Sequence, residues 1–382
     1  MSDPVPAAVS SPRLHLDFLD GMRALAAMFV VVTHLYTLVF GTQARTHWPL
    51  SLANGLLYGH LAVSVFIVIS GFCLTLPTLR SRQLARGATD FYWRRARRIL
   101  PPYFVALALP LILVTLGANT GSETPVELSH VFINALLLQD FAPNANSINF
   151  PLWSVAVECH IYFLFPLLLW VWRRFGLTPL LFAGVLMAAL ATLVWPLIWR
   201  EQSWRISCPW FIALFVFGMA AAALAHGQSD KSRLLASFVV VAAAALTGVL
   251  LWRHPIQGIA DEPFLAVLPW IDSALGALVA ALLGLLALPT PRLAPLKRAL
   301  EWRPLVWLGS FAYSLYLTHY FLMHIVLDTL KLVPRINDSR ALQTLAMFGI
   351  GLPVLIGSAY VFFLFCERPF LSRRAKAAIE TG

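Results

Sequence analysis

The chain has 382 residues, 59% of them apolar and only 12% charged, with a formal net charge of +10 and a mean hydropathy of +0.75. Soluble domains are roughly 45–50% apolar and about 25% charged, so this composition excludes both a soluble globular domain and a disordered chain. The apolar residues gather in runs of about twenty, the length of a helix that crosses ~30 Å of hydrocarbon. We therefore expect an all-α, polytopic integral membrane protein.

Apolar runs between charged residues and Pro or Gly breaks predict ten membrane spans. In chain order they cover residues 17–40, 56–77, 101–117, 152–172, 178–198, 209–226, 234–252, 267–288, 305–328 and 341–366. The apolar stretch 131–138 is too short to cross and is expected to lie on the outer surface as a helix. Residues 1–16 contain no cleavable apolar core, so we expect no signal peptide. A single membrane domain, residues 1–382, is expected to make up the chain, with residues 367–382 as its tail.

The positions of Lys and Arg predict how these spans are oriented. With residue 1 in the cytoplasm, twenty of the 28 Lys and Arg residues fall on cytoplasmic segments and seven on outer segments. Because basic residues gather on the cytoplasmic side of membrane proteins, both termini are predicted to be cytoplasmic. Membrane topology thus explains the excess of Lys and Arg over Asp and Glu, and nucleic acid is not an expected partner. The expected surroundings are the lipid bilayer.

The cysteines point to neither a disulfide framework nor a metal site. Cys73, Cys159, Cys208 and Cys366 have no CxxC spacing, and each lies in or beside an apolar run. Such cysteines are usually small core residues, so no metal is expected.

The first span contains two ionisable residues, Arg23 and His34. Each costs at least ~2.5 kcal/mol at the centre of a bilayer and is therefore a functional candidate. Eleven residues return a helix almost to its starting face, so both side chains lie on one stripe about 16 Å apart along the axis. The structural alternatives are an Arg23 that reaches the inner headgroups and a His34 that makes an interhelical hydrogen bond.

A carboxylate is expected at the depth of His34. Glu158 follows Trp153 in the fourth span, and both Glu158 and His34 lie roughly 9 Å below the outer interface. A carboxylate that holds an imidazole suits general base catalysis, and a structural buried pair is the alternative. Tyr316 and His319 share a face of the ninth span, where an aromatic packing stripe is equally compatible with the pattern.

The densest charge is the group Arg94, Arg95, Arg97 and Arg98, which precedes Pro101. Arginine grips phosphate through two parallel hydrogen bonds, so a cluster at a cytoplasmic pore mouth suits a nucleotide-bearing molecule. A topology anchor is the alternative interpretation. Ser70 and Gly71 lie in the inner half of the second span, near the depth of Arg23, and Gly71 also suits close helix packing.

These residues together resemble the membrane-bound acyltransferase 3 family, which includes bacterial O-acetylases. The matching segments follow one another along nearly the whole chain: Leu19–Ala26 with His34, Val65–Phe72, Arg95 and Arg98 before Ile99 and Pro101, Trp153 and Ser154 with Glu158 and Tyr162, Ser314–His319, and Glu367–Pro369. The C-terminal SGNH-type domain of some family members has no counterpart in the sequence. A glycan or small-molecule acylase is therefore expected rather than a peptidoglycan one.

The resemblance implies transfer of an acyl group, usually acetyl from acetyl-CoA, to a hydroxyl of a carbohydrate, lipid-linked glycan or small hydroxylated acceptor. In that family the matching positions are tied to activity, and they are Arg23, His34, Arg95, Arg98 and Glu158 here. From the residues and the family together we expect catalytic roles for Arg23, His34 and Glu158 and acyl-CoA binding by Arg95 and Arg98. We add Ser70 to the expected donor site. Trp153, Tyr316, His319 and Asp272 are the expected acceptor-site residues. The resemblance also implies a bacterial inner membrane. The predicted topology and the charge of CoA lead us to expect donor entry from the cytoplasm and acceptor entry from outside.

Two other classes of function suit the same polar residues. A proton-coupled transporter or lipid-linked sugar flippase also places His, Glu and Arg inside ten spans. A non-enzymatic membrane sensor or assembly factor would use Arg23, His34 and Glu158 for structure alone. Turnover of acyl-CoA by the purified protein would distinguish an enzyme from a transporter and from a sensor or assembly factor.

Overall fold

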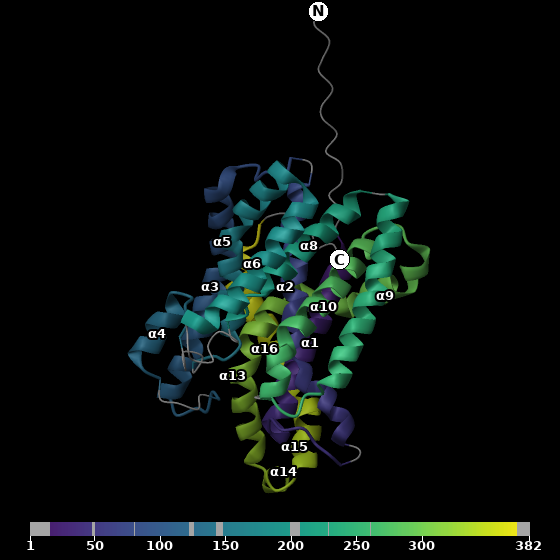
Figure 1. Ribbon diagram of the computed structural model, residues 1–382. Coiled ribbons are helices and arrows are strands. Elements are labelled where there is room, and N and C mark those ends of the chain that lie inside the picture. The colour runs from purple at the N-terminus through teal and green to yellow at the C-terminus, as the bar shows by residue number, and fades with distance from the viewer. Residues whose placement is uncertain are drawn as a thin grey trace, which may run out of the picture.

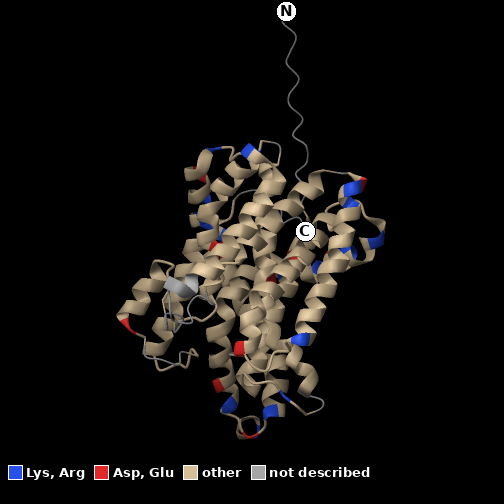
Figure 2. Ribbon diagram, viewed as in Figure 1, with Lys and Arg blue, Asp and Glu red and all other residues tan. Residues whose placement is uncertain are grey.

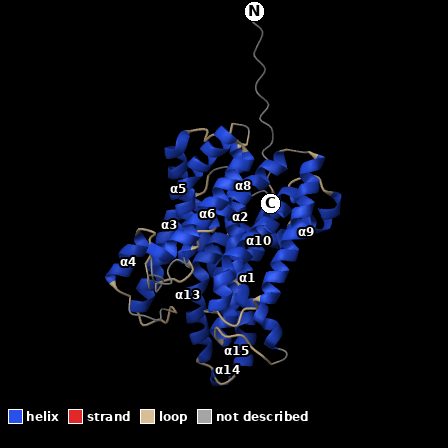
Figure 3. Ribbon diagram, in the orientation of Figure 1, coloured by secondary structure: helices blue, strands red, loops and turns tan. Residues whose placement is uncertain are grey.

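The computed structural model describes residues 16–47, 50–79, 81–121, 126–142, 148–198, 207–227, 229–259 and 261–372. Within these ranges the chain consists of helices and loops, apart from one isolated bridge between Gln43 and Gly258 (Figure 3). The all-α prediction is confirmed.

The helices form one elongated bundle (Figure 1). In chain order they are α1 (Asp17–Phe40), η1 (Leu50–Tyr58), α2 (His60–Thr75), α3 (Gly87–Thr115), α4 (Leu128–Ala135), α5 (Leu152–Phe175), α6 (Leu177–Ile198), α8 (Phe211–His226), α9 (Asp230–Arg253), α10 (Glu262–Leu286), α11 (Ala294–Leu300), α12 (Arg303–Ser310), α13 (Ala312–Lys331), α14 (Pro334–Asn337), α15 (Arg340–Ala346) and α16 (Leu352–Phe362). The π-helical turns η5 (Met347–Gly351) and η6 (Phe363–Glu367) flank α16.

Eight helical segments in the described part of the chain are long and apolar enough to span a membrane. The helix α8 is apolar but has 16 residues, and the 20-residue α13 is interrupted by Tyr, Thr and His side chains. Each of the ten predicted spans overlaps one of these helices. The eight-residue α4 is too short to cross, as the sequence predicted for 131–138.

Two predicted boundaries are wrong. Pro101 and Pro102 lie inside α3, which begins at Gly87, so the arginine cluster is helical instead of preceding the helix. Neighbouring helices can satisfy the carbonyls that a proline leaves unpaired, which is why the helix continues. The ninth span is divided at Phe311, between α12 and α13. Gly309 lies at this break, and a Cβ there would come within 1.9 Å of the Asp20 carbonyl oxygen of α1.

Charge and burial distinguish the ends of the bundle, its centre and its lipid-facing sides. Figure 2 shows Lys and Arg concentrated towards the two ends of the bundle, with the stretch between them mostly uncharged. The apolar windows of α6 and α9 are each 17% buried, whereas that of residues 51–78, which includes α2, is 67% buried. We infer that α6 and α9 face lipid and that α2 is central.

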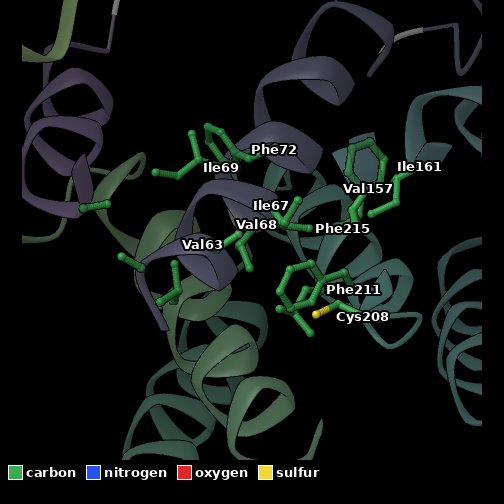
Figure 4. Close-up of a cluster of buried hydrophobic side chains, with 14 of the residues drawn as sticks. Val63, Ile67, Val68, Ile69, Phe72, Val157, Ile161, Cys208, Phe211 and Phe215 are labelled. Atoms are coloured by element: carbon green, nitrogen blue, oxygen red, sulfur yellow. The ribbon is translucent and has the colours of Figure 1, made fainter. Parts of the chain in front are cut away.

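The central helix α2 crosses α8 with direct backbone contact. A Cβ on Gly71 would lie 2.1 Å from the Phe215 carbonyl oxygen, and one on Gly218 would lie 2.1 Å from that of Val68. Small residues allow membrane helices to approach this closely. Figure 4 shows the apolar side chains around the crossing, including Phe72 and Phe215. The crossing fixes α2 and therefore the direction of Ser70, next to Gly71.

We expect Gly71→Ala and Gly218→Ala to destabilise the protein by about 1–3 kcal/mol each, because the added methyl group must push two backbones apart. Thermal unfolding of the purified protein in detergent measures this effect. Gly248→Ala on α9 is the matched control, since a Cβ there meets nothing within 4 Å. Midpoints for Gly71→Ala and Gly218→Ala equal to that of Gly248→Ala would contradict the packing argument.

Candidate active site

The central feature of the site is a pair of histidines from two packed helices. His34 of α1 and His319 of α13 approach to 2.8 Å between Nδ1 of His34 and Nε2 of His319. Their rings are nearly parallel, with an interplanar angle of 7° and centroids 5.1 Å apart. His319 is fully buried, whereas His34 is partly exposed.

The backbone of α13 sets the protonation of this pair. Nδ1 of His319 lies 2.7 Å from the carbonyl oxygen of Tyr316 and 3.1 Å from that of Leu315. Carbonyl oxygens only accept hydrogen bonds, so Nδ1 of His319 must carry a proton. In the neutral ring Nε2 of His319 is then an acceptor, and Nδ1 of His34 donates to it. Nε2 of His34 is left with a lone pair.

Two aromatic side chains lie around His34. Both pack edge-on against the His34 ring. The ring centroid of Phe150 is 5.9 Å away with an interplanar angle of 82°, and that of Tyr320 is 5.4 Å away with an angle of 84°. Phe150 belongs to the segment before α5 and is 40% exposed. His34 is therefore bordered by partly exposed aromatic residues.

The segment that carries Phe150 is fastened to the bundle by its neighbour Asn149. The buried Asn149 amide donates to the carbonyl oxygens of Ala106 on α3 at 3.1 Å and Leu317 on α13 at 3.0 Å. Asp140, earlier in the chain, is also buried, and desolvation raises the pKa of its carboxyl although His160 contacts it at 3.1 Å. The two hydrogen bonds of Asn149 hold its segment against α3 and α13.

The predicted direct pair between His34 and Glu158 is wrong. Glu158 accepts hydrogen bonds from Ser70 of α2 and from Tyr162, one turn along α5. Glu158 and Tyr162 share the face of α5 that turns to α2, while His319 takes the position beside His34.

The predicted equal depth is wrong as well. Gly59 contacts Thr33, next to His34, whereas Ser70 lies eleven residues further along α2, one turn from Cys73, the partner of Arg23. Glu158 is therefore nearer the level of Arg23 than that of His34.

Arg23 and Glu367 form a second polar group, nearer the N-terminal end of α1. The Arg23 guanidinium pairs with Asp20 and donates to Cys73 Sγ of α2 at 3.1 Å. Glu367, which is 2% exposed, accepts from Ser314 at 2.6 Å. The charges of Arg23 and Arg98 both act on the Glu367 carboxyl.

The arginine cluster has two distinct members. Arg98 is exposed, whereas Arg95 is partly buried and its charge acts on Glu158 and Tyr162. The buried Nε of Arg95 has no hydrogen-bond partner within the described ranges. Arg94 instead pairs with Asp90. An unpaired guanidinium nitrogen beside an exposed arginine fits an anionic group such as a phosphate.

Asp272 lies in a further polar cluster that includes a residue the sequence analysis missed. Its carboxylate contacts His60 at 3.1 Å, Ser64 at 2.6 Å and Trp210 at 2.8 Å. His60 stacks on Trp153, with centroids 5.7 Å apart. The signal for His60 was its spacing from Ser64, because residues i and i+4 share one face of a helix. Among the described residues no three His, Cys, Asp or Glu side chains could hold a metal ion.

The remaining predicted residues link these clusters. The Tyr316 hydroxyl and Ser154 Oγ are 2.7 Å apart, which joins α13 to α5 next to Trp153. The structure therefore brings His34, His319 and Tyr316 together. It also brings together Glu158, Ser70 and Tyr162, and separately Asp272 and Trp153 through His60.

A profile described as the acyltransferase domain matches residues 16–364. The chain belongs to this acyltransferase family. Family membership favours an enzyme over a transporter or a sensor. No solved structure matches the chain.

Three curated relatives are similar to this acyltransferase-family chain. Peptidoglycan O-acetyltransferase OatA of Listeria monocytogenes is 23% identical over 94% of the chain and 56% of its own length. Nodulation protein 10 of Rhizobium leguminosarum is 30% identical over 47% of the chain and 50% of its own length. Acyltransferase MdmB of Streptomyces mycarofaciens is 25% identical over 82% of the chain and 80% of its own length. The chain thus spans about half the length of the first two relatives.

We expect Asn149→Ala to loosen the segment that holds Phe150, because the carbonyls of Ala106 and Leu317 lose their donor. A buried unsatisfied carbonyl costs about 1–3 kcal/mol. Hydrogen exchange should be faster at the amides of residues 148–150, with a lower unfolding midpoint. The exposed Asn337→Ala is the control. Unchanged exchange in Asn149→Ala would show that Asn149 does not fasten the segment.

Proposed function

We propose that the protein is a membrane O-acyltransferase that moves an acyl group, in the simplest case acetyl, from acyl-CoA to a hydroxyl of a glycan or another exported hydroxylated acceptor. The observation that carries the proposal is the lone pair on Nε2 of His34, which the backbone of α13 sets through His319. Family membership supports the class of reaction.

Nε2 of His34 acts as the general base. It takes the proton of the acceptor hydroxyl while the hydroxyl oxygen attacks the thioester carbonyl. The carbon–sulfur bond then breaks, the CoA thiolate leaves, and the proton passes from Nε2 to the sulfur. While the His34 ring is protonated on both nitrogens, its hydrogen bond to His319 becomes charge-assisted and stronger. His319 thereby has the orienting role that a carboxylate has in other catalytic sites.

Arg95 and Arg98 bind the phosphates of the donor. The unpaired Nε of Arg95 and the exposed position of Arg98 support this role. Glu158 belongs to the donor path, because its charge acts on Arg95 while Ser70 and Tyr162 hold its carboxylate. Only the acyl arm enters the bundle, past Arg23, and the axial distance from Arg23 to His34 is about 16 Å.

The two substrates reach the bundle from opposite sides. Basic residues favour the cytoplasmic side, which supports donor binding there at the end of the bundle that contains Arg95. A CoA headgroup carries several charges and does not cross hydrocarbon. The acceptor approaches His34 from the Phe150 side. The membrane is the inner membrane of a bacterium, and an exported polysaccharide is an acceptor of the expected class.

We expect His34→Ala to lower acyl transfer by about 10²–10⁴-fold, the usual contribution of a general base. Release of CoA from acetyl-CoA in the presence of a hydroxyl acceptor measures the rate in detergent-purified protein. His226→Ala, which changes an exposed histidine at the end of α8, controls for loss of any imidazole. A His34→Ala rate within about threefold of the wild-type rate would contradict the catalytic role of His34.

Arg95→Lys and Arg98→Lys retain the positive charge, and with it the topology, but lose the paired hydrogen bonds to phosphate. We expect each to raise the KM for acetyl-CoA by roughly tenfold, which corresponds to about 1.4 kcal/mol of binding energy. Arg97→Lys is the matched control, because Arg97 is exposed and adjacent. Unchanged KM values in both variants would show that the arginine cluster does not bind the donor and would favour the alternative of a topology anchor.

A further inference from the structure

Asp272 on α10 is a fully buried carboxylate with donors on both oxygens. Oδ1 accepts from Ser64 of α2 at 2.6 Å, and Oδ2 lies 2.8 Å from Nε1 of Trp210 and 3.1 Å from Nε2 of His60. The Asp272 side chain is 0% exposed, whereas that of His60 is 26% exposed. The carboxylate of Asp272 is therefore enclosed by protein, whereas part of the His60 ring that it holds remains accessible.

The carboxylate fixes which nitrogen of His60 is available. A carboxylate only accepts, so Nε2 of His60 donates to Asp272 and the neutral ring has its lone pair on Nδ1. Nδ1 has no hydrogen-bond partner within the described ranges. Trp153, nearly parallel to the ring at 2°, and Phe211 at 5.8 Å hold its plane.

His60 lies at the level of His34. The residues that precede them, Gly59 and Thr33, are in contact, since a Cβ on Gly59 would come within 2.4 Å of Thr33 Oγ1. One short segment contacts both imidazoles, with Phe150 against His34 and Trp153 against His60. Two oriented imidazoles, each with an available lone pair, therefore occur at one level of the bundle.

We propose that His60, positioned by Asp272, binds a second hydroxyl of a polyhydroxylated acceptor, while Nε2 of His34 receives the proton of the hydroxyl that is acylated. This inference rests on the proposed acyltransferase function. A sugar offers several hydroxyls along one edge and can donate to both nitrogens, whereas a monohydric alcohol satisfies only His34. A purely structural contact between Asp272 and His60 explains less, because well-packed apolar side chains are commonly as stable as a buried polar or charged pair.

The test compares two acceptors that differ in hydroxyl number: methyl glucopyranoside and cyclohexanol. Acetyl-CoA is the donor, and CoA release and acetylated product are both measured. The variants are His60→Phe, which keeps a ring but removes the lone pair, and Asp272→Asn, which keeps the shape but releases the orientation of His60. His226→Phe is the matched control on an exposed histidine. Size-exclusion chromatography checks that each variant is folded.

We expect both site variants to raise the KM for methyl glucopyranoside at least tenfold, with the KM values for cyclohexanol and acetyl-CoA within threefold of wild type. Equal losses with both acceptors would reveal a structural role and overturn the inference, as would an unchanged KM for the glucoside. If His60→Phe does not fold, Asp272→Asn decides on the same criteria. Acetylation of cyclohexanol but not of the glucoside by wild type would overturn the sugar subsite alone. Absence of any CoA release by wild type would overturn the proposed function as well.

Discussion

The hydrogen bond from His34 to His319 is the interaction on which the proposed chemistry depends. In most catalytic histidines a carboxylate holds the second ring nitrogen, but here a neutral imidazole does so, and two backbone carbonyls of α13 hold that imidazole in turn. This arrangement places no carboxylate against His34 itself, and a charged side chain within a bilayer is energetically costly. Because those carbonyl groups can only accept, His319 must donate to them from Nδ1, and His34 must in turn donate to His319. The geometry thus leaves one nitrogen of His34 available for a substrate.

Helix packing determines where this nitrogen lies relative to Arg95 and Arg98, the proposed donor site. The close crossing of α2 and α8 at Gly71 and Gly218 brings Ser70 to Glu158. Gly309 gives α12 its close approach to α1, just before α13 begins. The polar groups near the N-terminal end of α1 and those around His34 consequently belong to one set of packed helices. In the proposed mechanism, a donor bound at one end and an acceptor at the other meet on α1.

The sequence predicted the elements better than the partners. Hydrophobic length located the helices, because a span of about twenty apolar residues has few other uses. Helical rise placed His34 and Glu158 at one level, but the structure pairs Glu158 with Ser70, one turn from Cys73, the partner of Arg23, so the predicted depth was also wrong. The rotation of each helix about its axis is set by packing against neighbours far away in sequence, so the partner of His34 was assigned wrongly. His60 was missed because a histidine at the start of a span is ordinary, and only Asp272, on a helix two hundred residues later, makes it distinctive.

The most direct test of the account is the tautomer of His34. Nitrogen-15 NMR of histidine-labelled protein in liposomes at neutral pH distinguishes a protonated ring nitrogen from an unprotonated one, and a His34→Gln difference spectrum assigns the signals. The account predicts that His34 is protonated on Nδ1 and unprotonated on Nε2. His319 should show the same pattern, and His319→Ala should return His34 to the more common Nε2-protonated form. A wild-type His34 already protonated on Nε2 would contradict the central claim.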